Sequence, residues 1–425
     1  MNFLATSSLW RSLRHRNYRL YLTGQLVSVC GTWMQQVALS WLVYRLTGSA
    51  TLLGVVGFAS QIPIFVLGPV GGVISDRYSC HRVAVWSQCA ALTQALLLAL
   101  LTLTGWIQPG HIIVLGVALG LVYAFDMPAR QALVHQLVET EDLGNAVALN
   151  SSMINSARIV GPALAGIVVA KFGEGICFLI NAISYVAVIL ALLAMKLPER
   201  PAALVKAISI MASLREGLRY TLATTPIRDL LILLGVVGFM GMPYMTLMPV
   251  FAANVHKSGA DALGLMYGAV GLGAVIGALF LAQRKNIIGI GRVIVVATLL
   301  FGLGLIVFTV SRPFWLTLVI LVAVGCGWMV LIAACNTALQ TLADNHMRGR
   351  VMSLFSMMLV GMAPFGSLLA GWAADQIGAP LVIAAGGGFC TLAGIIFARQ
   401  LPRLREAAKP ILIARGIIAD PTLEN

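Results

Sequence analysis

The sequence has very few charged residues for its length. Only 10% of its 425 residues are Asp, Glu, Lys or Arg, whereas 59% are hydrophobic and the mean hydropathy is +0.93. Soluble domains carry roughly 25% charged residues, so a soluble fold has no way to hide this much apolar surface from water. We therefore expect lipid to be the solvent for most of the chain.

The sequence also lacks the short motifs of common enzymes and metal sites. Its seven cysteines include no Cys-x-x-Cys pair, so neither a disulfide framework nor a zinc site is indicated. It contains no Gly-x-x-x-x-Gly-Lys-Ser/Thr phosphate loop, no His-Glu-x-x-His and no Gly-x-Ser-x-Gly. We therefore expect no ATP-driven step, no enzymatic activity, no cofactor and no metal.

Long apolar runs are what the sequence does have. A helix needs about 20 apolar residues to span a bilayer, and twelve such runs follow one another along the chain. The expected spans are 17–44, 50–75, 82–104, 111–136, 145–171, 175–197, 227–253, 261–283, 291–311, 314–340, 349–374 and 379–399. The fold class predicted by this pattern is an all-α polytopic membrane protein.

The basic residues indicate which side of the membrane each loop faces. With the N-terminus in the cytoplasm, 23 Lys and Arg residues lie inside, four lie outside and one is in mid-span. Lys and Arg favour cytoplasmic loops, so we predict that both termini are cytoplasmic. Because the basic residues recur at every second loop and form no single patch, the net charge of +13 does not indicate nucleic acid as a partner.

The chain is predicted to consist of two pseudo-symmetric six-helix halves. The longest break between spans, 198–226, has apolar residues at helical spacing, which is typical of an amphipathic helix on the inner membrane face. Ala165-Gly166 recurs 205 residues later as Ala370-Gly371, which is typical of a parallel repeat. The expected domains are an N-terminal bundle (1–197), an amphipathic linker (198–226), a C-terminal bundle (227–399) and a cytoplasmic tail (400–425).

A polar segment between the second and third spans resembles the main motif of the major facilitator superfamily. The matching residues are Gly72, Asp76, Arg77 and Arg82, and the sequence departs from the motif at Ser79 and His81. The resemblance implies a conformational latch that holds two halves of a transporter in the outward-facing state, with Arg130 as a further charged member. The alternative is that these are ordinary loop charges that set the topology.

Two further features extend the resemblance to one branch of that superfamily. Span five contains Ala157, Gly161-Pro162 and Ala165-Gly166, which resemble the antiporter pattern. Residues 125–131 and 141–150 resemble the siderophore and drug exporters of transmembrane secretion effector type, the branch that contains the enterobactin exporter. The resemblance implies a monomeric secondary transporter of the bacterial cytoplasmic (inner) membrane that exports its cargo by alternating access and proton antiport.

Two charged residues are expected inside the membrane, where such residues are rare and usually functional. Burial favours the neutral form of Asp126 in span four, whereas Arg130 one turn away favours its charged form. Asp126 is therefore a candidate for proton coupling, and the alternative is a permanent Asp126–Arg130 pair that braces span four. Arg158 in span five either pairs within the protein or holds an anionic group of the cargo.

Polar residues within apolar spans are the candidates for a substrate cavity. Gln25, Ser28, Thr32 and Gln36 share one face of span one by their spacing, and a polar face within lipid must point at protein or water. The further cavity candidates are Asn150, Asn155, Arg158, Tyr244 and Asn336. The alternative for these residues is hydrogen bonding between helices.

The sequence thus predicts a secondary transporter that exports small amphipathic organic molecules, such as siderophores, other secondary metabolites or drugs. Its partners would be the small-molecule cargo, protons and membrane lipid. Two alternatives stay open, namely a transporter of lipids or lysophospholipids and a membrane sensor that binds its ligand without moving it.

Overall fold

The computed structural model describes residues 8–196, 210–284 and 289–415, and in these residues it contains helices but no strand. Within these ranges, twelve helical segments are long and apolar enough to cross a membrane. They are α1 (Arg16–Thr47), α2 (Ala50–Arg77), α3 (Cys80–Leu103), α4 (Pro109–Leu137), α5 (Leu143–Phe172), α6 (Glu174–Leu193), α8 with α9 (Thr225–Val236 and Pro243–Val250), α10 (Ala260–Ala282), α11 (Ile290–Val310), α12 (Phe314–Leu342), α13 with α14 (Arg348–Ser356 and Met362–Ile377) and α15 (Ala379–Ala414). The predicted all-α fold with twelve spans is therefore confirmed.

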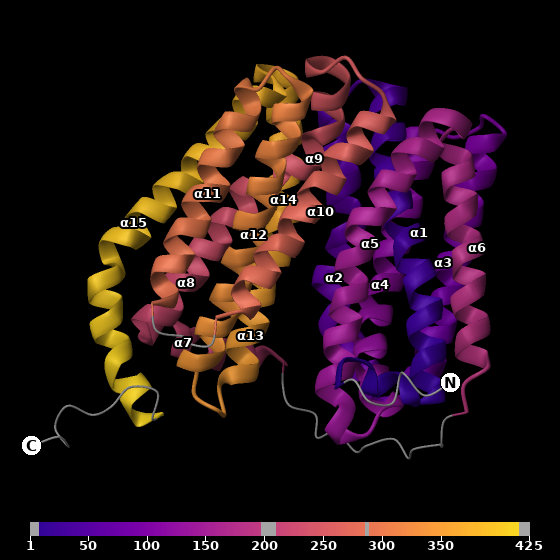
Figure 1. The fold of residues 1–425 in the computed structure, drawn as a ribbon. Helices are drawn as coiled ribbons and strands as arrows, with labels where there is room; N and C mark the ends of the chain where they lie inside the picture. Colours follow the sequence, from indigo (N-terminus) through magenta and orange to yellow (C-terminus); the bar gives the residue numbers. More distant parts are fainter. Residues whose placement is uncertain (1–7, 197–209, 285–288, 416–425) are drawn as a thin grey trace, which may run out of the picture. The chain divides into compact units, whose positions relative to one another are not determined.

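The described residues form two compact units, and the first consists of those that lie within Met1–Lys206 and Thr246–Gly268. Within it, α1 packs on α5 and α6, α2 packs on α4, and α3 packs on α4 and α6, as Figure 1 shows. Its core includes the fully buried Tyr18 and Leu133. This packing places one polar face of α1 against α3, α4 and α6, and the candidate site lies there.

The second unit consists of the described residues within Ala207–Met245 and Ala269–Asn425. Within it, α11 packs on α12 and α15, and α15 also packs on α8 and α14 (Figure 1). Glycines allow this close packing, since a Cβ atom added to Gly302 of α11 would lie 2.9 Å from the carbonyl oxygen of Gly387 in α15. Close approach at glycines is common between membrane helices.

Two of the described spans are interrupted by a π-helical turn, and a further π turn, Phe251–Val255, ends the seventh span. In the seventh span the turn covers Val237–Gly241 and is followed by Pro243, and in the eleventh it covers Met357–Gly361 and is followed by Pro364. Proline has no N–H, and its ring clashes with the carbonyl group four residues earlier. A wider turn just before each proline relieves that clash, and π turns of this kind are frequent at functional sites.

The predicted linker lies only partly within the described residues. Residues 198–209 lie outside them, and α7 (Ile210–Ala223) covers most of the rest. Leu218 and Leu222 on α7 are 48% and 55% exposed, so this helix presents apolar side chains, as an interfacial helix does. An ion pair of 2.6 Å between Glu216 on α7 and Arg350 on α13 ties the helix to the second unit.

The last helix is longer than the sequence analysis predicts. α15 continues through Ala414, so much of the segment expected as a tail is helical. The reason is that leucines at 401, 404 and 412 keep a helical spacing, and Leu404 is 5% exposed. At its end, Arg415 donates a hydrogen bond to the carbonyl oxygen of Ala343.

Candidate functional site

A charged cluster is buried in the first unit. Asp126 on α4 is fully buried, and its Oδ2 lies 2.6 Å from Nη2 of Arg130, one turn along the same helix. Gln88 on α3 donates from Nε2 to Asp126 Oδ1 at 2.9 Å, and Arg130 donates from Nη1 to Gln25 Oε1 on α1 at 2.7 Å. These four residues, which we call the Asp126 cluster, connect three helices.

The local helix geometry brings these groups together. Side chains four residues apart lie on the same helix face, so Asp126 and Arg130 meet without any distortion of α4. Gln25 and Gln88 are 0% and 2% exposed. Each amide makes one hydrogen bond to the ion pair, while Gln25 Nε2 and Gln88 Oε1 are buried without a hydrogen-bond partner among the described residues. Arg130 differs from the other three, because 23% of its side chain is exposed.

The Asp126 cluster has no net charge when Asp126 is ionised. A buried ion pair is tolerated only with good geometry and further hydrogen bonds, and both are present. A proton added to the carboxyl group would cancel the negative charge and leave the guanidinium charge of Arg130 uncompensated within the cluster. The arrangement can therefore exist in two charge states that differ by one proton.

A second polar cluster lies further along α1 and consists of neutral groups. Gln35 donates from Nε2 to Gln94 Oε1 of α3 at 3.1 Å and accepts from Asn181 Nδ2 of α6 at 2.8 Å. Ser184, on α6, lies 3.1 Å from the Asn181 side-chain oxygen. Gln35 and Asn181 are 2% and 0% exposed. This cluster connects helices by hydrogen bonds and has no charge to couple to a proton.

The predicted polar face of α1 is placed partly inside the first unit. Gln25 and Ser28 are buried, Thr32 is half-buried and Gln36 is exposed. The Thr32 hydroxyl donates to the carbonyl oxygen of Ser28 at 3.0 Å. Gln25 belongs to the Asp126 cluster, whereas Gln36 is exposed, and its role in a cavity stays a prediction.

The remaining cavity candidates are spread over both units. On α5, Asn150 and Asn155 are half-buried, and Asn155 donates to the carbonyl oxygen of Ser151 at 3.0 Å. Tyr244 is 1% exposed in the second unit. Asn336 is half-buried on α12 of the same unit and accepts from Gln340 at 2.5 Å. Their role in a cavity stays a prediction.

Arg158 on α5 stacks against an aromatic ring. Its guanidinium carbon lies 5.3 Å from the centre of the Trp33 ring on α1. A cation over the face of Trp is attracted by the negative ring face, and the attraction grows where water is excluded. The sequence left two alternatives for Arg158, namely a partner within the protein or an anionic group of the cargo. The contact with Trp33 is a partner of the first kind.

The antiporter-like motif provides close helix contacts on both sides of α5. Ala157 and Ala165 are buried. A Cβ atom added to Gly161 would lie 2.6 Å from the Cβ of Trp33 on α1, and one added to Gly166 would lie 3.0 Å from the carbonyl oxygen of Ala260, where α10 begins. Within the first unit, larger side chains at these two glycines would push neighbouring helices away from α5.

The latch segment lies at the end of α2. The side chain of Asp76 lies outside the described part of the chain, while Arg77 is exposed. Among the described residues, a Cβ atom added to Gly72 would meet nothing within 4 Å, whereas the preceding Gly71 lies against the Ala124 carbonyl of α4. The latch, together with the proposed role of Arg130 in it, stays a prediction.

The segment before α5 anchors the start of the chain's first helix. Asp142 has a fully buried side chain, and its Oδ2 lies 2.8 Å from Arg14 and 2.9 Å from His15. Asn145 accepts from the backbone N–H of Ser12 at 3.0 Å. Sequence reasoning identified 141–150 by resemblance alone, and the structure shows that its polar residues hold the N-terminal 3-10 turn, Ser8–Arg14.

Sequence reasoning missed Gln88 as a member of the candidate site. The available signal was an amide within the apolar third span, where polar groups must find a partner. No spacing rule links it to Asp126, which lies 38 residues further on.

Comparison with known proteins identifies the family of this chain. The sequence profile of the transmembrane secretion effector family matches residues 7–424. The multidrug efflux pump Tap of Mycolicibacterium fortuitum is 28% identical over 92% of this chain and 98% of its own length. The enterobactin exporter EntS of Citrobacter koseri is 27% identical over 95% of this chain and 96% of its own length.

The fold also matches solved transporter structures. The crystal structure of the D323A mutant of the nucleoside transporter NupG superposes with a TM-score of 0.72. At 13% identity it covers 91% of this chain and 99% of that protein, so the likeness concerns the fold. The chain therefore belongs to the transmembrane secretion effector family of the major facilitator superfamily, and it is a multi-pass membrane transporter of small molecules and not an enzyme.

Proposed function

We propose that this protein is a proton-coupled exporter of small amphipathic organic molecules that works by alternating access. Its relatives named as a multidrug efflux pump and an enterobactin exporter support the direction and the size class of the cargo. The distribution of Lys and Arg supports cytoplasmic termini and a location in the cytoplasmic membrane. Siderophores, other secondary metabolites and drugs are the cargo classes that fit.

The Asp126 cluster is the observation that carries the proposal. In the resting state Asp126 is ionised and paired with Arg130. A proton that reaches Oδ2 converts the carboxylate to a neutral acid, and the guanidinium of Arg130 keeps its charge. The hydrogen bond from Arg130 to Gln25 is then its remaining contact in the cluster. Because the Arg130 side chain is partly exposed, it can turn toward water or an anionic group of the cargo.

The change in net charge links binding of the proton to the conformation of the transporter. A neutral cluster becomes a cluster with one positive charge, and a charge without a counter-charge within a membrane protein is destabilising. That cost favours the state of the transporter in which Arg130 meets water or an anion. Release of the proton on the other side restores the Asp126–Arg130 pair and completes the cycle.

The experiment is transport in proteoliposomes with and without an imposed pH gradient. The probes are enterobactin and the fluorescent cation ethidium, and the variants are wild type and Asp126→Asn. Glu141→Gln is the matched control, because it removes an exposed carboxylate near the end of α4, outside the Asp126 cluster. We expect the gradient to accelerate export by wild type and by the control.

The Asp126→Asn variant is expected to move the probes down their own gradient at a rate that the pH gradient does not change. If Asp126 and Arg130 only brace α4, the folded variant keeps its response to the gradient. A folded Asp126→Asn protein that is still accelerated by the pH gradient would therefore refute proton coupling at this residue.

A further inference from the structure

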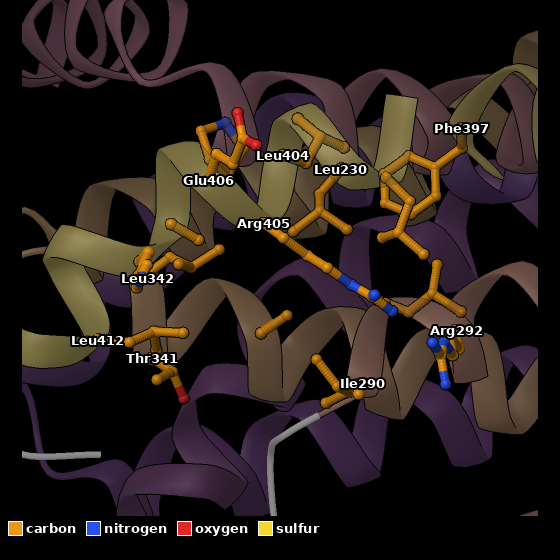
Figure 2. A pocket seen from close by; sticks show the side chains of 18 residues that line it. Leu230, Ile290, Arg292, Thr341, Leu342, Phe397, Leu404, Arg405, Glu406 and Leu412 are labelled. Atoms are coloured by element: carbon orange, nitrogen blue, oxygen red, sulfur yellow. The ribbon is translucent and has the colours of Figure 1, made fainter. Parts of the chain in front are cut away.

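A cavity of about 500 Å³ lies in the second unit, away from the Asp126 cluster. It is formed where α8 and α11 begin and where α12 ends, and the final stretch of α15 covers one side of it (Figure 2). The part of α15 that lines it, from Phe397 to Leu412, is about 22 Å long at 1.5 Å per residue.

Most of the cavity wall is apolar. Its largest apolar side chains are Leu230, Ile294, Leu342, Phe397, Leu404 and Leu412. These side chains come from four different helices, so the apolar wall is built by tertiary packing and is not a stripe along one helix. A wall of this kind is a suitable environment for a hydrocarbon chain and not for a strongly hydrated solute.

Basic side chains gather at the same cavity. Arg292, Arg405 and Lys409 line it together with one acid, Glu406. Figure 2 shows that the Arg405 side chain extends toward Arg292, whereas the Glu406 carboxylate points away from both guanidinium groups. No carboxylate of the described residues lies within 4.0 Å of Arg292, Arg405 or Lys409, so the excess of positive charge is not neutralised by those residues.

The cavity lies at the level where a lipid headgroup is expected. The start of α8, the start of α11 and the end of α12 are all predicted to face the cytoplasm by the distribution of Lys and Arg. Basic pockets between membrane helices on that side are suited to acidic lipid headgroups. The hydrogen bond from Arg415 to Ala343 holds the end of α15 against α12 and keeps this side of the cavity in place.

We propose that this cavity binds an anionic phospholipid of the cytoplasmic leaflet. Its phosphate lies between Arg292 and Arg405, because paired guanidinium groups present N–H donors that match phosphate oxygens. Lys409 adds a further positive charge at the headgroup. One acyl chain lies along the apolar wall toward Phe397. This site is separate from the Asp126 cluster, and the proposal does not depend on proton coupling.

The test is native mass spectrometry of the purified full-length protein with added phosphatidylglycerol or phosphatidylcholine. The main variant is the double substitution Arg292→Gln/Arg405→Gln. We expect wild type to bind phosphatidylglycerol more tightly than phosphatidylcholine. The double variant is expected to bind phosphatidylglycerol roughly 30-fold more weakly, because two cations near an anionic headgroup are lost, while its binding of phosphatidylcholine changes little.

Two further variants control the result. Arg403→Gln removes a charge from an exposed position of α15 that does not line the cavity, and it is expected to bind lipid as wild type does. Ala408→Trp fills the cavity and leaves its basic residues in place, so it is expected to lose phosphatidylglycerol as well. The thermal melting of each variant without added lipid shows that it is folded, and if the double variant does not fold, Ala408→Trp decides the question.

Several results would overturn the proposal. A folded double variant that keeps its affinity for phosphatidylglycerol would do so, as would an equal loss for both lipids or an equal loss in Arg403→Gln. If phosphatidylglycerol binds to a truncated protein that ends at Arg415 but not to the full-length protein, residues 416–425 occupy the cavity instead. An Arg405-dependent dimer in the same spectra would assign the surface to a second copy of the chain.

Discussion

The coupling between Asp126 and Arg130 can be measured as a free energy of unfolding. The perturbation is a double-mutant cycle that consists of Asp126→Asn, Arg130→Gln and the two substitutions combined. Asp126 is fully buried, so Arg130→Gln leaves a carboxylate without its counter-charge in the interior. Loss of one partner of a buried pair costs about 3–5 kcal/mol.

The other two variants, Asp126→Asn and the combined substitution, are expected to lose less free energy of unfolding than Arg130→Gln. Asp126→Asn leaves Arg130 with a side chain that is 23% exposed and still bonded to Gln25. We therefore expect a loss of about 1–3 kcal/mol, the cost of an incompletely satisfied group. The combined variant has no charge, and its amides can keep the hydrogen bonds to Gln88 and Gln25. We expect it to be more stable than Arg130→Gln alone.

The assay is reversible unfolding of the purified protein in mixed micelles, in which the fraction of denaturing detergent is raised and tryptophan fluorescence is recorded. Independent sites add within about 0.3–0.5 kcal/mol, and we expect the cycle to show a coupling energy well above that limit. If the combined variant loses as much free energy of unfolding as the two single variants together, Asp126 and Arg130 are not coupled. The same result would remove the basis for the two charge states of the Asp126 cluster.

Three other predictions use matched pairs of residues or a single charge. Gly161→Ala is expected to destabilise the protein by about 1–3 kcal/mol through overpacking against α1, whereas Gly144→Ala on the same helix meets nothing within 4 Å and should be neutral in the same unfolding assay. Gln35→Leu leaves buried amides unpaired and is expected to cost about 1–3 kcal/mol, while the exposed Gln36→Leu should leave unfolding unchanged. Asp76→Asn is expected to stop transport in proteoliposomes while expression stays normal, and full transport in that variant would contradict the latch.

The fold was predictable because lipid imposes strong constraints on the sequence. Every backbone polar group in a bilayer must be paired within its own segment, so twelve long apolar runs predict twelve helices, and the structure confirms them. The lengths of the spans were less constrained. Near the C-terminus, leucines beyond residue 399 extend α15 into residues that are polar enough to be taken for a tail.

The candidate site was predictable only in part. Asp126 and Arg130 are four residues apart on one helix, so their contact follows from the sequence. The face of α1 was harder, because the sequence shows which residues share a polar face but not where that face stops meeting the neighbouring helices. Ser28 and Gln35 are seven residues apart and are both buried, whereas Gln36, which a straight 3.6-residue period selects, is exposed.

The exposure of Arg130 bears on the choice between a proton-coupled switch and a structural brace. A pair that only braces a helix is most stable when both charges are enclosed and all their hydrogen bonds are made. In the first unit the carboxylate is enclosed, but nearly a quarter of the guanidinium side chain is not. Under the proposed coupling, protonation of Asp126 would be the change that lets the partly exposed Arg130 turn away from it, whereas a brace would keep the pair closed in every state.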